Sequence, residues 1–441
     1  MFIEFKPRAL RGLRVYIETY GCWLNKAESE IMKTLLAEDG VEVVDRVDEA
    51  DVIIINTCAV RGDTERKMMR RIRELYEVSS LRGIKLVVAG CLARVRPARI
   101  SRVAPSASLL GPDYVEKVLN VVAQKGRAIC LLEDDSRRRV LPKFFGGIRY
   151  VVPVESGCVG NCAYCIGKVA RPKLKSYDIK SVVSHVKSAV SRGAKEVYLT
   201  GQDVASYGLD RGTNIVELLR RILSEVRGDY KIRVGMMEPS LVLKFLDELI
   251  EVYADERVYK YLHVPAQSFD DGVLKLMNRK YTYDEFKQIV KAFRNEFPEA
   301  TIATDLIVGF PGEDEEAFRT TYERLDEISP DKVHVARYTI RPFTKAAYQK
   351  QVPEVVKNQR TTMLVKKVFR ITLLRNMNFL SRVMDALITD VSFKGNSFVG
   401  RLKNYRPVII PIDKQLSIGV NVKVKIVGCT SIDLRGALLN A

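Results

Sequence analysis

The chain has 441 residues, which is longer than a chain that folds around a single hydrophobic core, so we expect several domains. Its hydrophobic content of 47% fits a globular protein, and no apolar run of about eighteen residues predicts a membrane span. The eight cysteines follow no disulfide pattern, and the start of the chain lacks the apolar segment of a signal peptide, so a reducing, cytoplasmic location is expected. A formal charge of +18 favours a polyanionic partner such as nucleic acid.

Residues 13–118 alternate strand-like and helix-like segments, which is typical of a doubly wound α/β domain. Strands are expected at residues 13–20, 51–56 and 85–90, and helices at residues 27–39 and 63–77. A cysteine follows each of these strands: Cys22, Cys58 and Cys91. Open α/β sheets bind ligands at the carboxyl ends of their strands, so the three thiols are expected to converge on a cluster site. The alternative is three ordinary buried cysteines.

A second set of cysteines, Cys158, Cys162 and Cys165, has the local spacing C-x3-C-x2-C. Gly157 and Gly160 allow the tight backbone that lets three thiolates converge. Thiolates suit iron–sulfur clusters, and three cysteines leave one iron of a four-iron cubane without a protein ligand. A structural zinc site would need a fourth Cys or His nearby, and none follows within the motif. The pattern therefore predicts a cluster with one open iron.

From residue 150 to about residue 348 the pattern changes to repeated strand–helix units. Strands are expected at residues 150–154, 196–200, 231–236, 259–264, 301–308 and 332–339. Six such units fit an incomplete (β/α) barrel, in which chemistry lies at the carboxyl ends of the strands. Gly201, His263 and Gly309 fall at such ends, although His263 fits a hydrogen-bonded structural role equally well.

Basic segments lie on both sides of this barrel. Arg137–Arg139, with Pro142 and two glycines, predict a flexible linker. Residues 355–384 hold seven Lys or Arg and no acid, which indicates either an RNA-binding helix or a solvated face. Residues 61–102 hold twelve basic and four acidic side chains, net +8, and residues 374–441 hold ten and four, net +6. These excesses favour binding to a phosphate backbone.

Short strands after residue 385, separated by glycine turns, predict a small antiparallel β-barrel. Because this barrel holds no clustered cysteine, its removal is expected to leave the metal sites intact. Cys130 and Cys429 have no partner spacing and are interpreted as structural.

The central cysteine loop resembles that of the radical S-adenosylmethionine (SAM) enzymes, in which an aromatic residue, here Tyr164, precedes the last cysteine. The resemblance implies that SAM binds the open iron and is cleaved reductively to a 5′-deoxyadenosyl radical. It also implies that SAM is bound by Tyr164 and by the regions of Gly201, Gln202 and Gly309.

The motifs around Cys22, Cys58 and Cys91, followed by this core, resemble the methylthiotransferase family. The resemblance implies an auxiliary cluster on these cysteines, and hence two [4Fe–4S] clusters together with SAM. It also implies that the terminal barrel is an RNA-binding TRAM domain. The sequence departs from the family pattern at Glu28, where Asp is usual, and at Trp23, which follows the first cysteine. Pro172 stands where the archaeal and eukaryotic branch of the family has Gly.

The residues after the central loop, Lys168 to Arg171, resemble the archaeal and eukaryotic branch that acts on N6-threonylcarbamoyladenosine at tRNA position 37. The expected activity is insertion of a methylthio group at C2 of this nucleoside, with the tRNA anticodon stem-loop as partner. An electron donor and a sulfur source of unknown identity are also implied. The alternatives are isopentenyladenosine in tRNA, an aspartate of a ribosomal protein, or a non-catalytic iron–sulfur RNA-binding protein.

The expected architecture is therefore α/β and multidomain. A doubly wound α/β N-terminal domain with the auxiliary cluster is expected at residues 12–125, and an incomplete (β/α)6 radical SAM barrel at residues 146–375. The TRAM-like RNA-binding barrel is expected at residues 376–441. No catalytic residue is predicted beyond the cluster ligands.

Overall fold

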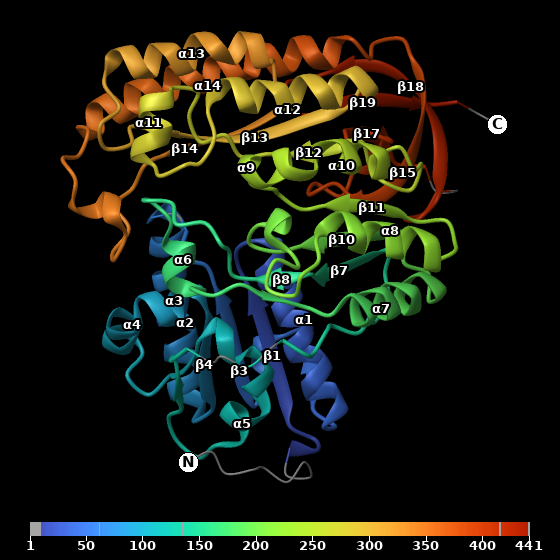
Figure 1. The fold of residues 1–441 in the computed structure, drawn as a ribbon. Coiled ribbons are helices and arrows are strands. Elements are labelled where there is room, and N and C mark those ends of the chain that lie inside the picture. Colours follow the sequence, from blue (N-terminus) through green and yellow to red (C-terminus); the bar gives the residue numbers. More distant parts are fainter. Residues whose placement is uncertain (1–9, 61, 134–135, 137, 414–415, 440–441) are drawn as a thin grey trace.

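The computed structural model describes residues 10–60, 62–133, 136, 138–413 and 416–439. Figure 1 shows three parts in chain order: a blue amino-terminal sheet, a green-to-orange layer of strands and helices above it, and a small red barrel beside that layer. None of the described helices is both long and apolar enough to cross a membrane.

The amino-terminal unit is a parallel sheet with helices on both faces. Its elements are β1 (Arg14–Thr19), α1 (Trp23–Glu38), β2 (Glu42–Val44), β3 (Val52–Thr57), α2 (Gly62–Arg82), β4 (Lys85–Gly90), α3 (Cys91–Val95), α4 (Pro97–Val103), β5 (Ser108–Leu110), α5 (Val118–Ala123) and β6 (Ile129–Cys130). The strand order is β2-β1-β3-β4-β5-β6. All six residues of β3 are buried, as its continuous apolar run predicts.

The three strands that precede the cysteines are neighbours in this sheet. The register pairs Thr19 with Asn56, and Thr57 with Gly90, so β1, β3 and β4 end at the same level. The predicted doubly wound α/β arrangement is confirmed, and the residues that follow the three strands lie along one edge of the sheet.

The central unit contains two three-stranded parallel sheets, β11-β10-β7 and β12-β13-β14, which form a curved, incomplete barrel. A single bridge between Ile232 and Val258 joins the two halves. Its elements are β7 (Arg149–Pro153), β8 (Glu155–Ser156), α6 (Ile166–Ala170), β9 (Lys175–Ser176), α7 (Ile179–Ser191), β10 (Glu196–Thr200), α8 (Ile215–Glu225), β11 (Lys231–Val234), α9 (Pro239–Val242), α10 (Leu246–Tyr253), β12 (Tyr261–His263), α11 (Asp271–Leu276), α12 (Tyr283–Glu296), β13 (Thr301–Val308), α13 (Glu315–Ile328) and β14 (Lys332–Arg337).

The segment between the two units is less exposed than a flexible linker. Arg138 is buried, and its guanidinium donates to the carbonyl of Pro112 and lies within 4 Å of the carboxylates of Glu28 and Asp113. The expectation of a flexible basic linker is therefore wrong at Arg138, because this charge is paired inside the fold. Arg137 lies outside the described residues.

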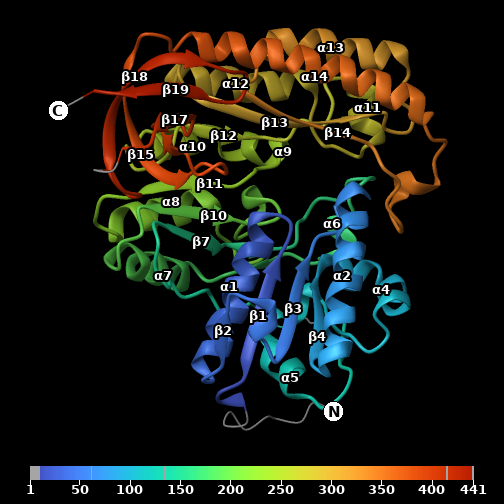
Figure 2. The ribbon, with the colours of Figure 1, turned by 180° about the vertical axis from the view of Figure 1, so that it is seen from behind.

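Helix α14 (Glu354–Met377) runs along the back of the central unit beside α13 and reaches the terminal barrel (Figure 2). Its basic run binds the protein's own carboxylates. The ion pairs are Lys357–Glu354, Arg360–Glu313, Arg360–Glu315, Lys367–Asp326, Arg370–Asp326, Arg375–Asp331 and Arg382–Glu299. Of the seven basic residues of this run, only Lys366 has no ion pair with another described residue. Lys357, Arg360 and Lys367 are buried, so these three cations stabilise the packing of α14.

The terminal unit is a closed barrel of five strands in the order β15-β16-β17-β19-β18. Its strands are β15 (Val383–Val391), β16 (Ser397–Arg401), β17 (Pro407–Pro411), β18 (Asn421–Cys429) and β19 (Leu434–Leu438). The predicted small barrel is confirmed. Neighbouring strands are antiparallel except for β17 and β19, which pair in parallel.

The terminal barrel closes the base of the central barrel. The ring of Tyr405 packs edge-on against Tyr259 and Tyr261, with centroids 5.0 Å apart in each pair, and its hydroxyl lies 2.6 Å from that of Tyr198. Nearby, Arg149 binds both Glu196 and Asp390. Removing the terminal barrel would expose these rings and take Asp390 away from Arg149. The expectation that this removal leaves the metal sites intact stays a prediction.

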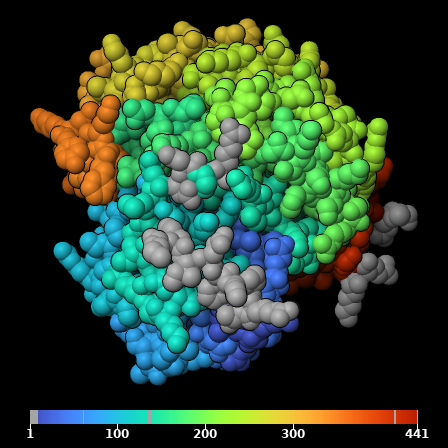
Figure 3. Space-filling model, turned by 60° about the horizontal axis from the view of Figure 1, so that its bottom comes forward, coloured from blue at the N-terminus to red at the C-terminus, as the bar shows by residue number. Residues whose placement is uncertain are grey.

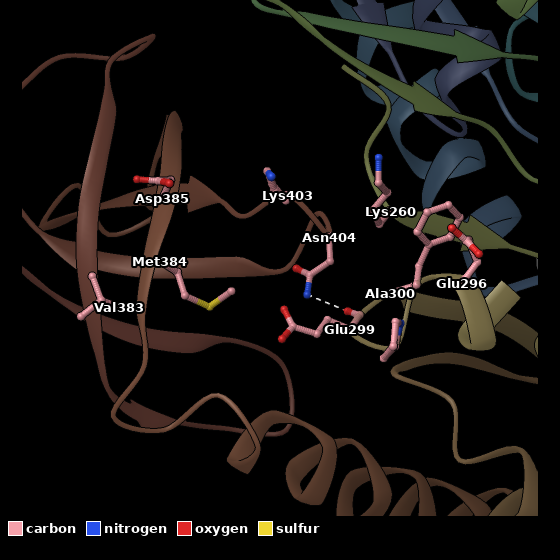
Figure 4. Close-up of a pocket in the computed structure, with 11 residues that line it drawn as sticks. Lys260, Glu296, Glu299, Ala300, Val383, Met384, Asp385, Lys403 and Asn404 are labelled. Atoms are coloured by element: carbon pink, nitrogen blue, oxygen red, sulfur yellow. Dashed lines mark hydrogen bonds between the residues drawn. The ribbon is translucent and has the colours of Figure 1, made fainter. Parts of the chain in front are cut away.

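A hollow of about 390 Å³ marks the seam between the central unit and the terminal barrel (Figure 4). Asn404 donates across this seam to the carbonyl of Glu299 at 2.8 Å. Lys260 lines the hollow, but its ammonium group already donates to the carbonyls of Asp255 and Val258. The hollow therefore reflects imperfect packing between two units and is not an anion site.

One buried carboxylate, that of Asp331, joins three elements of the fold. It binds Arg294 of α12 at 3.2 Å, Arg375 of α14 at 2.8 Å, and Arg406 of the terminal barrel. Burial by itself raises the pKa of Asp331, but the three arginines outweigh it and hold this pKa below its usual value.

We expect Asp331→Asn to lower the free energy of unfolding by about 3–5 kcal/mol, because it leaves the buried guanidinium of Arg406 and the half-buried ones of Arg294 and Arg375 without their counter-charge. Since the pKa of Asp331 is lowered in the folded state, this stabilisation is present above the ordinary carboxyl pKa and is lost as the pH falls through the lowered value. Urea unfolding of the two proteins measures the loss. The control is Glu251→Gln, whose exposed pair with Arg220 contributes less than about 1 kcal/mol. Equal losses in the two variants would contradict the assignment.

Candidate active site

The amino-terminal triad, Cys22, Cys58 and Cys91, lies along the carboxyl edge of β1, β3 and β4. Cys22 is exposed and precedes α1, whereas Cys58 and Cys91 are buried. Burial is the main cause that raises the pKa of Cys91 to about 12, with smaller contributions from Cys58 and Cys22 and an opposing one from Arg171. The same two causes, burial and then Cys22, raise the pKa of Cys58. The structure therefore brings the three predicted thiols together at one edge of the sheet.

Close packing fixes the backbone around the amino-terminal triad. Gly21 has a φ of +106°, and a Cβ there would lie 2.7 Å from the Cβ of Cys58. The amide of Asn25 donates to the carbonyls of Tyr20 and Thr57 at 3.0 and 2.9 Å, which ties the loop after β1 to the end of β3. These contacts hold Cys22 and Cys58 in a fixed relation to each other.

The central triad, Cys158, Cys162 and Cys165, lies in the loop between β8 and α6. Gly157 has a φ of +89°, and a Cβ there would lie 1.9 Å from the carbonyl oxygen of Lys173, so only glycine fits. Lys168 donates to the carbonyl of Cys158 at 2.6 Å and closes the loop on itself. Burial raises the pKa of Cys165, and the charge of Cys162 adds to this effect. The loop thus gathers its three thiols locally.

Two charged side chains from distant parts of the chain contact the central triad. Arg279 donates to the sulfur of Cys162 at 3.2 Å and lies 3.2 Å from a carboxylate oxygen of Glu238. The carboxylate of Asp203 lies 3.7 Å from the sulfur of Cys158 and accepts from Ser206 at 2.5 Å. Arg279 could not be identified from the sequence, because it has no motif spacing to the cysteine that it contacts.

Unsatisfied polar groups mark a ligand site beside the central triad. Neither the nitrogen nor the oxygen of the Gln202 side-chain amide has a hydrogen-bond partner, although both atoms are buried. One carboxylate oxygen of Glu155 is likewise buried without a partner. Buried polar groups are normally paired, so these atoms fit a polar ligand such as SAM. The three thiols also suit a thiophilic cluster, and the site therefore fits both cofactors.

Neighbouring protein atoms explain why glycine is needed at the two positions that were expected to bind SAM. At Gly201 a Cβ would lie 1.8 Å from a carboxylate oxygen of Glu155, and at Gly309 it would lie 2.3 Å from the Cγ of Lys357. Protein atoms therefore explain both glycines without a cofactor. Tyr164 packs its ring edge-on against Phe310, with centroids 6.3 Å apart. SAM binding by Tyr164, Gly201, Gln202 and Gly309 stays a prediction.

His263, the other residue considered at a strand end, has a hydrogen-bonding partner in the protein. Its Nε2 lies 3.2 Å from a carboxylate oxygen of Asp305, and its ring lies 5.9 Å from that of His334. The contact with Asp305 agrees with a structural role for His263.

The two triads lie at one interface between the amino-terminal and central units. Helix α6 begins directly after Cys165, α3 begins at Cys91, and Ile166 and Ala170 of α6 are part of the same core as Cys91. A second contact comes from the segment after β14, which is drawn in orange at the edge of Figure 3. There Arg341 donates to the carbonyl of Ala59 and pairs with Glu65, both at 2.9 Å.

Among the described residues, no group of three or more His, Cys, Asp or Glu side chains has the arrangement of a single-ion metal site. A four-iron cubane is larger than one ion, so its cysteines stand further apart than the ligands of a single ion. The separation within each triad therefore does not count against a cluster.

Three family models match successive parts of the chain. The radical SAM superfamily matches residues 152–325, the uncharacterized protein family UPF0004 matches residues 14–111, and the TRAM domain matches residues 380–439. The three matches follow the order of the three structural units. The radical SAM match implies a [4Fe–4S] cluster and SAM as cofactors.

Solved structures support the fold. The radical SAM methyltransferase TsrM from Kitasatospora setae, solved with cobalamin and a [4Fe–4S] cluster, superposes with a TM-score of 0.55 at 14% identity. The match covers 76% of this chain and 74% of that chain. At this low identity the likeness supports the fold alone.

Curated relatives match almost the whole chain. A Pyrococcus horikoshii protein described as a probable threonylcarbamoyladenosine tRNA methylthiotransferase is 42% identical over 410 residues, covering 90% of this chain and 94% of that protein. The protein of the same description from Methanocaldococcus jannaschii is 38% identical and covers 98% of both chains. The human threonylcarbamoyladenosine tRNA methylthiotransferase is 32% identical, covering 90% of this chain and 69% of the human protein. The resemblance seen in the motifs is thereby confirmed, and the chain belongs to the threonylcarbamoyladenosine tRNA methylthiotransferase family.

Proposed function

We propose that this protein converts N6-threonylcarbamoyladenosine at position 37 of tRNA to its 2-methylthio form, with two [4Fe–4S] clusters and SAM. The observation that supports this most is the presence of two cysteine triads at one interface, with α3 and α6 packed between them. A radical SAM cluster needs only the central triad, so a second triad beside it supports sulfur insertion in addition to radical formation. Relatives described as acting on this nucleoside match nearly the whole chain.

In this proposal the central triad holds the cluster that binds SAM, and the amino-terminal triad holds the cluster that presents the inserted sulfur. When bound, the first cluster and SAM supply a 5′-deoxyadenosyl radical, which suits a C–H position that has no acidic proton. The residues of the chain position these groups. Arg279 donates to Cys162, and Gln202 offers an unsatisfied donor and acceptor to the amino-acid part of SAM.

The proposed division of labour follows the three units, with boundaries at residues 12–125, 146–375 and 376–441. The same chemistry on isopentenyladenosine or on a ribosomal-protein aspartate is the main alternative. A non-catalytic iron–sulfur RNA-binding protein is a weaker alternative, because a structural cluster is normally closed by a fourth ligand and each triad here has three cysteines.

The first prediction concerns the number of clusters. Replacing Cys158, Cys162 and Cys165 by Ala should leave about half of the iron in reconstituted protein, because each cluster uses its own thiolates. Replacing Cys22, Cys58 and Cys91 should do the same. The matched control replaces Cys130 and Cys429, which lie outside both triads, and it should retain all of the iron. Loss of all iron from either triple variant would contradict independent sites, and iron and sulfide analysis measures the outcome.

The second prediction separates the roles of the two clusters and tests the substrate. The variant without the amino-terminal triad should still cleave SAM to 5′-deoxyadenosine but should produce no methylthiolated nucleoside. The wild-type protein should modify tRNA that carries threonylcarbamoyladenosine and leave tRNA that carries isopentenyladenosine unchanged. Chromatography of 5′-deoxyadenosine and mass spectrometry of digested tRNA give both results. Wild-type product from the triple variant would remove the amino-terminal cluster from the reaction, and modification of isopentenyladenosine would favour the alternative substrate.

Helix α2 offers a surface for the RNA. Arg66, Arg70 and Arg73 are exposed, recur at a spacing that places them on one face, and form no ion pair with another described residue. The helix begins shortly after Cys58, so this basic face extends from the proposed cluster site. On the terminal barrel, Lys423 and Lys425 of β18 are similarly exposed. Both surfaces hold exposed basic side chains that remain available to phosphates.

The third prediction tests the α2 surface. Replacing Arg66, Arg70 and Arg73 by Gln should weaken tRNA binding and reduce the slope of log affinity against log salt by about 0.7–0.9 per lost contact. The control replaces Lys180, Lys187 and Arg192, an equally exposed set at α7, and should leave the slope unchanged. Binding measured across a salt series for both variants decides the matter. Equal slopes in all three proteins would exclude α2 from the interface.

A further inference from the structure

The segment that follows the central triad enters the amino-terminal unit. Helix α6 starts directly after Cys165, and its residues Ile166 and Ala170 pack in the amino-terminal core. Arg171 is the next residue, and it is almost completely buried. The backbone of Arg171 therefore belongs to the central loop, whereas its side chain reaches into the amino-terminal unit.

The side chain of Arg171 is fixed by four acceptors. Its Nη1 binds one carboxylate oxygen of Glu28 at 2.5 Å, and its Nη2 binds the other at 2.7 Å. The guanidinium also donates to the hydroxyl of Ser156 at 3.0 Å and to the side-chain oxygen of Asn25 at 3.4 Å. Both members of the ion pair are 3% exposed. A bidentate, desolvated pair of this kind holds the guanidinium in one position.

The guanidinium of Arg171 lies beside the amino-terminal triad. The side-chain oxygen of Asn25, which accepts from Arg171 at 3.4 Å, also lies 3.7 Å from the sulfur of Cys22. Its partner Glu28 belongs to α1, the helix that begins directly after Cys22. Ala170, the residue before Arg171, packs in the same core as Cys91. The contacts of the guanidinium therefore place it next to the amino-terminal site.

We propose that Arg171 is a positioning residue shared by the two cluster sites: the central loop places it, and its charge raises the reduction potential of the cluster on the amino-terminal triad. The inference rests on the proposed function, because it requires a cluster at that triad. A four-iron cluster on three thiolates is negatively charged and gains a further negative charge on reduction. A buried fixed cation beside it stabilises the reduced state more than the oxidised state.

Two residues of this contact depart from the patterns named above. Glu28 is the partner of Arg171, and Pro172 follows it and fixes the backbone torsion φ at the end of the loop. The proline removes one degree of freedom from the segment that carries the guanidinium.

The test uses full-length protein in which one triad has been replaced, so that each cluster is observed alone. In the background without the central triad, Arg171→Met should lower the midpoint potential of the remaining cluster, and Arg171→Lys should restore most of it. Glu28→Gln removes the opposing charge but keeps an acceptor, and should raise the same potential. In the background without the amino-terminal triad, Arg171→Met should leave the potential of the central cluster unchanged. Redox titration followed by electron paramagnetic resonance measures all of these potentials.

The outcomes separate the inference from the proposed function. If the background without the central triad binds no iron, the two-cluster proposal fails regardless of Arg171. If this background binds iron and neither Arg171→Met nor Glu28→Gln shifts the potential, the role of Arg171 is overturned. Equal shifts of both clusters would also overturn it, because they would indicate a general loss of structure. Should Arg171→Met fail to assemble, the opposite shift expected of Glu28→Gln still decides the question.

Discussion

Two buried ion pairs across one interface determine how the two cysteine triads face each other. Arg171 pairs with Glu28, and Arg341 with Glu65, and in each case an arginine of the central unit meets a carboxylate of the amino-terminal unit. The removal of these charges from water is costly and is offset only when both partners are in place. Partial separation of the units would leave charges buried without a partner. The interface is therefore either fully formed or fully open, and the spacing between the two triads is fixed by electrostatics as well as by packing.

The geometry of this interface also explains why each triad can remain open. Both sets of cysteines follow strands at their carboxyl ends, and the two sheets present these ends to each other. Cys91 begins α3 and Cys165 precedes α6, and these two short helices pack together. A closed structural cluster would require a fourth ligand from this crowded region. Beside the central triad, the buried side-chain amide of Gln202 has no hydrogen-bond partner among the described residues.

Local patterns in the sequence predict most of the fold, and long-range contacts escape them. Runs of apolar residues predict the strands, the cysteine after each run predicts the amino-terminal triad, and the local cysteine spacing predicts the central triad. The basic residues of α14 can be read from the sequence. Their partners Glu313, Asp326 and Asp331 lie about 40 residues earlier, so the ion pairs that turn these basic residues toward the protein cannot be predicted from it. The contact between Arg279 and Cys162, which are 117 residues apart, cannot be predicted from the sequence for the same reason. Gly201 and Gly309 are identifiable as special positions, whereas the cause, a clash with Glu155 or Lys357, appears only in three dimensions.

The closure of the central barrel by Tyr405 has a consequence for folding during synthesis. The rings that Tyr405 covers belong to residues between 198 and 261, which leave the ribosome long before residue 405 does. Domains generally fold from the amino terminus during synthesis, at about 5–20 residues per second. The rings of Tyr198, Tyr259 and Tyr261 around Arg233 therefore stay exposed to water for roughly ten seconds or more at that rate. The nascent protein must keep these rings from aggregating until its final strands arrive.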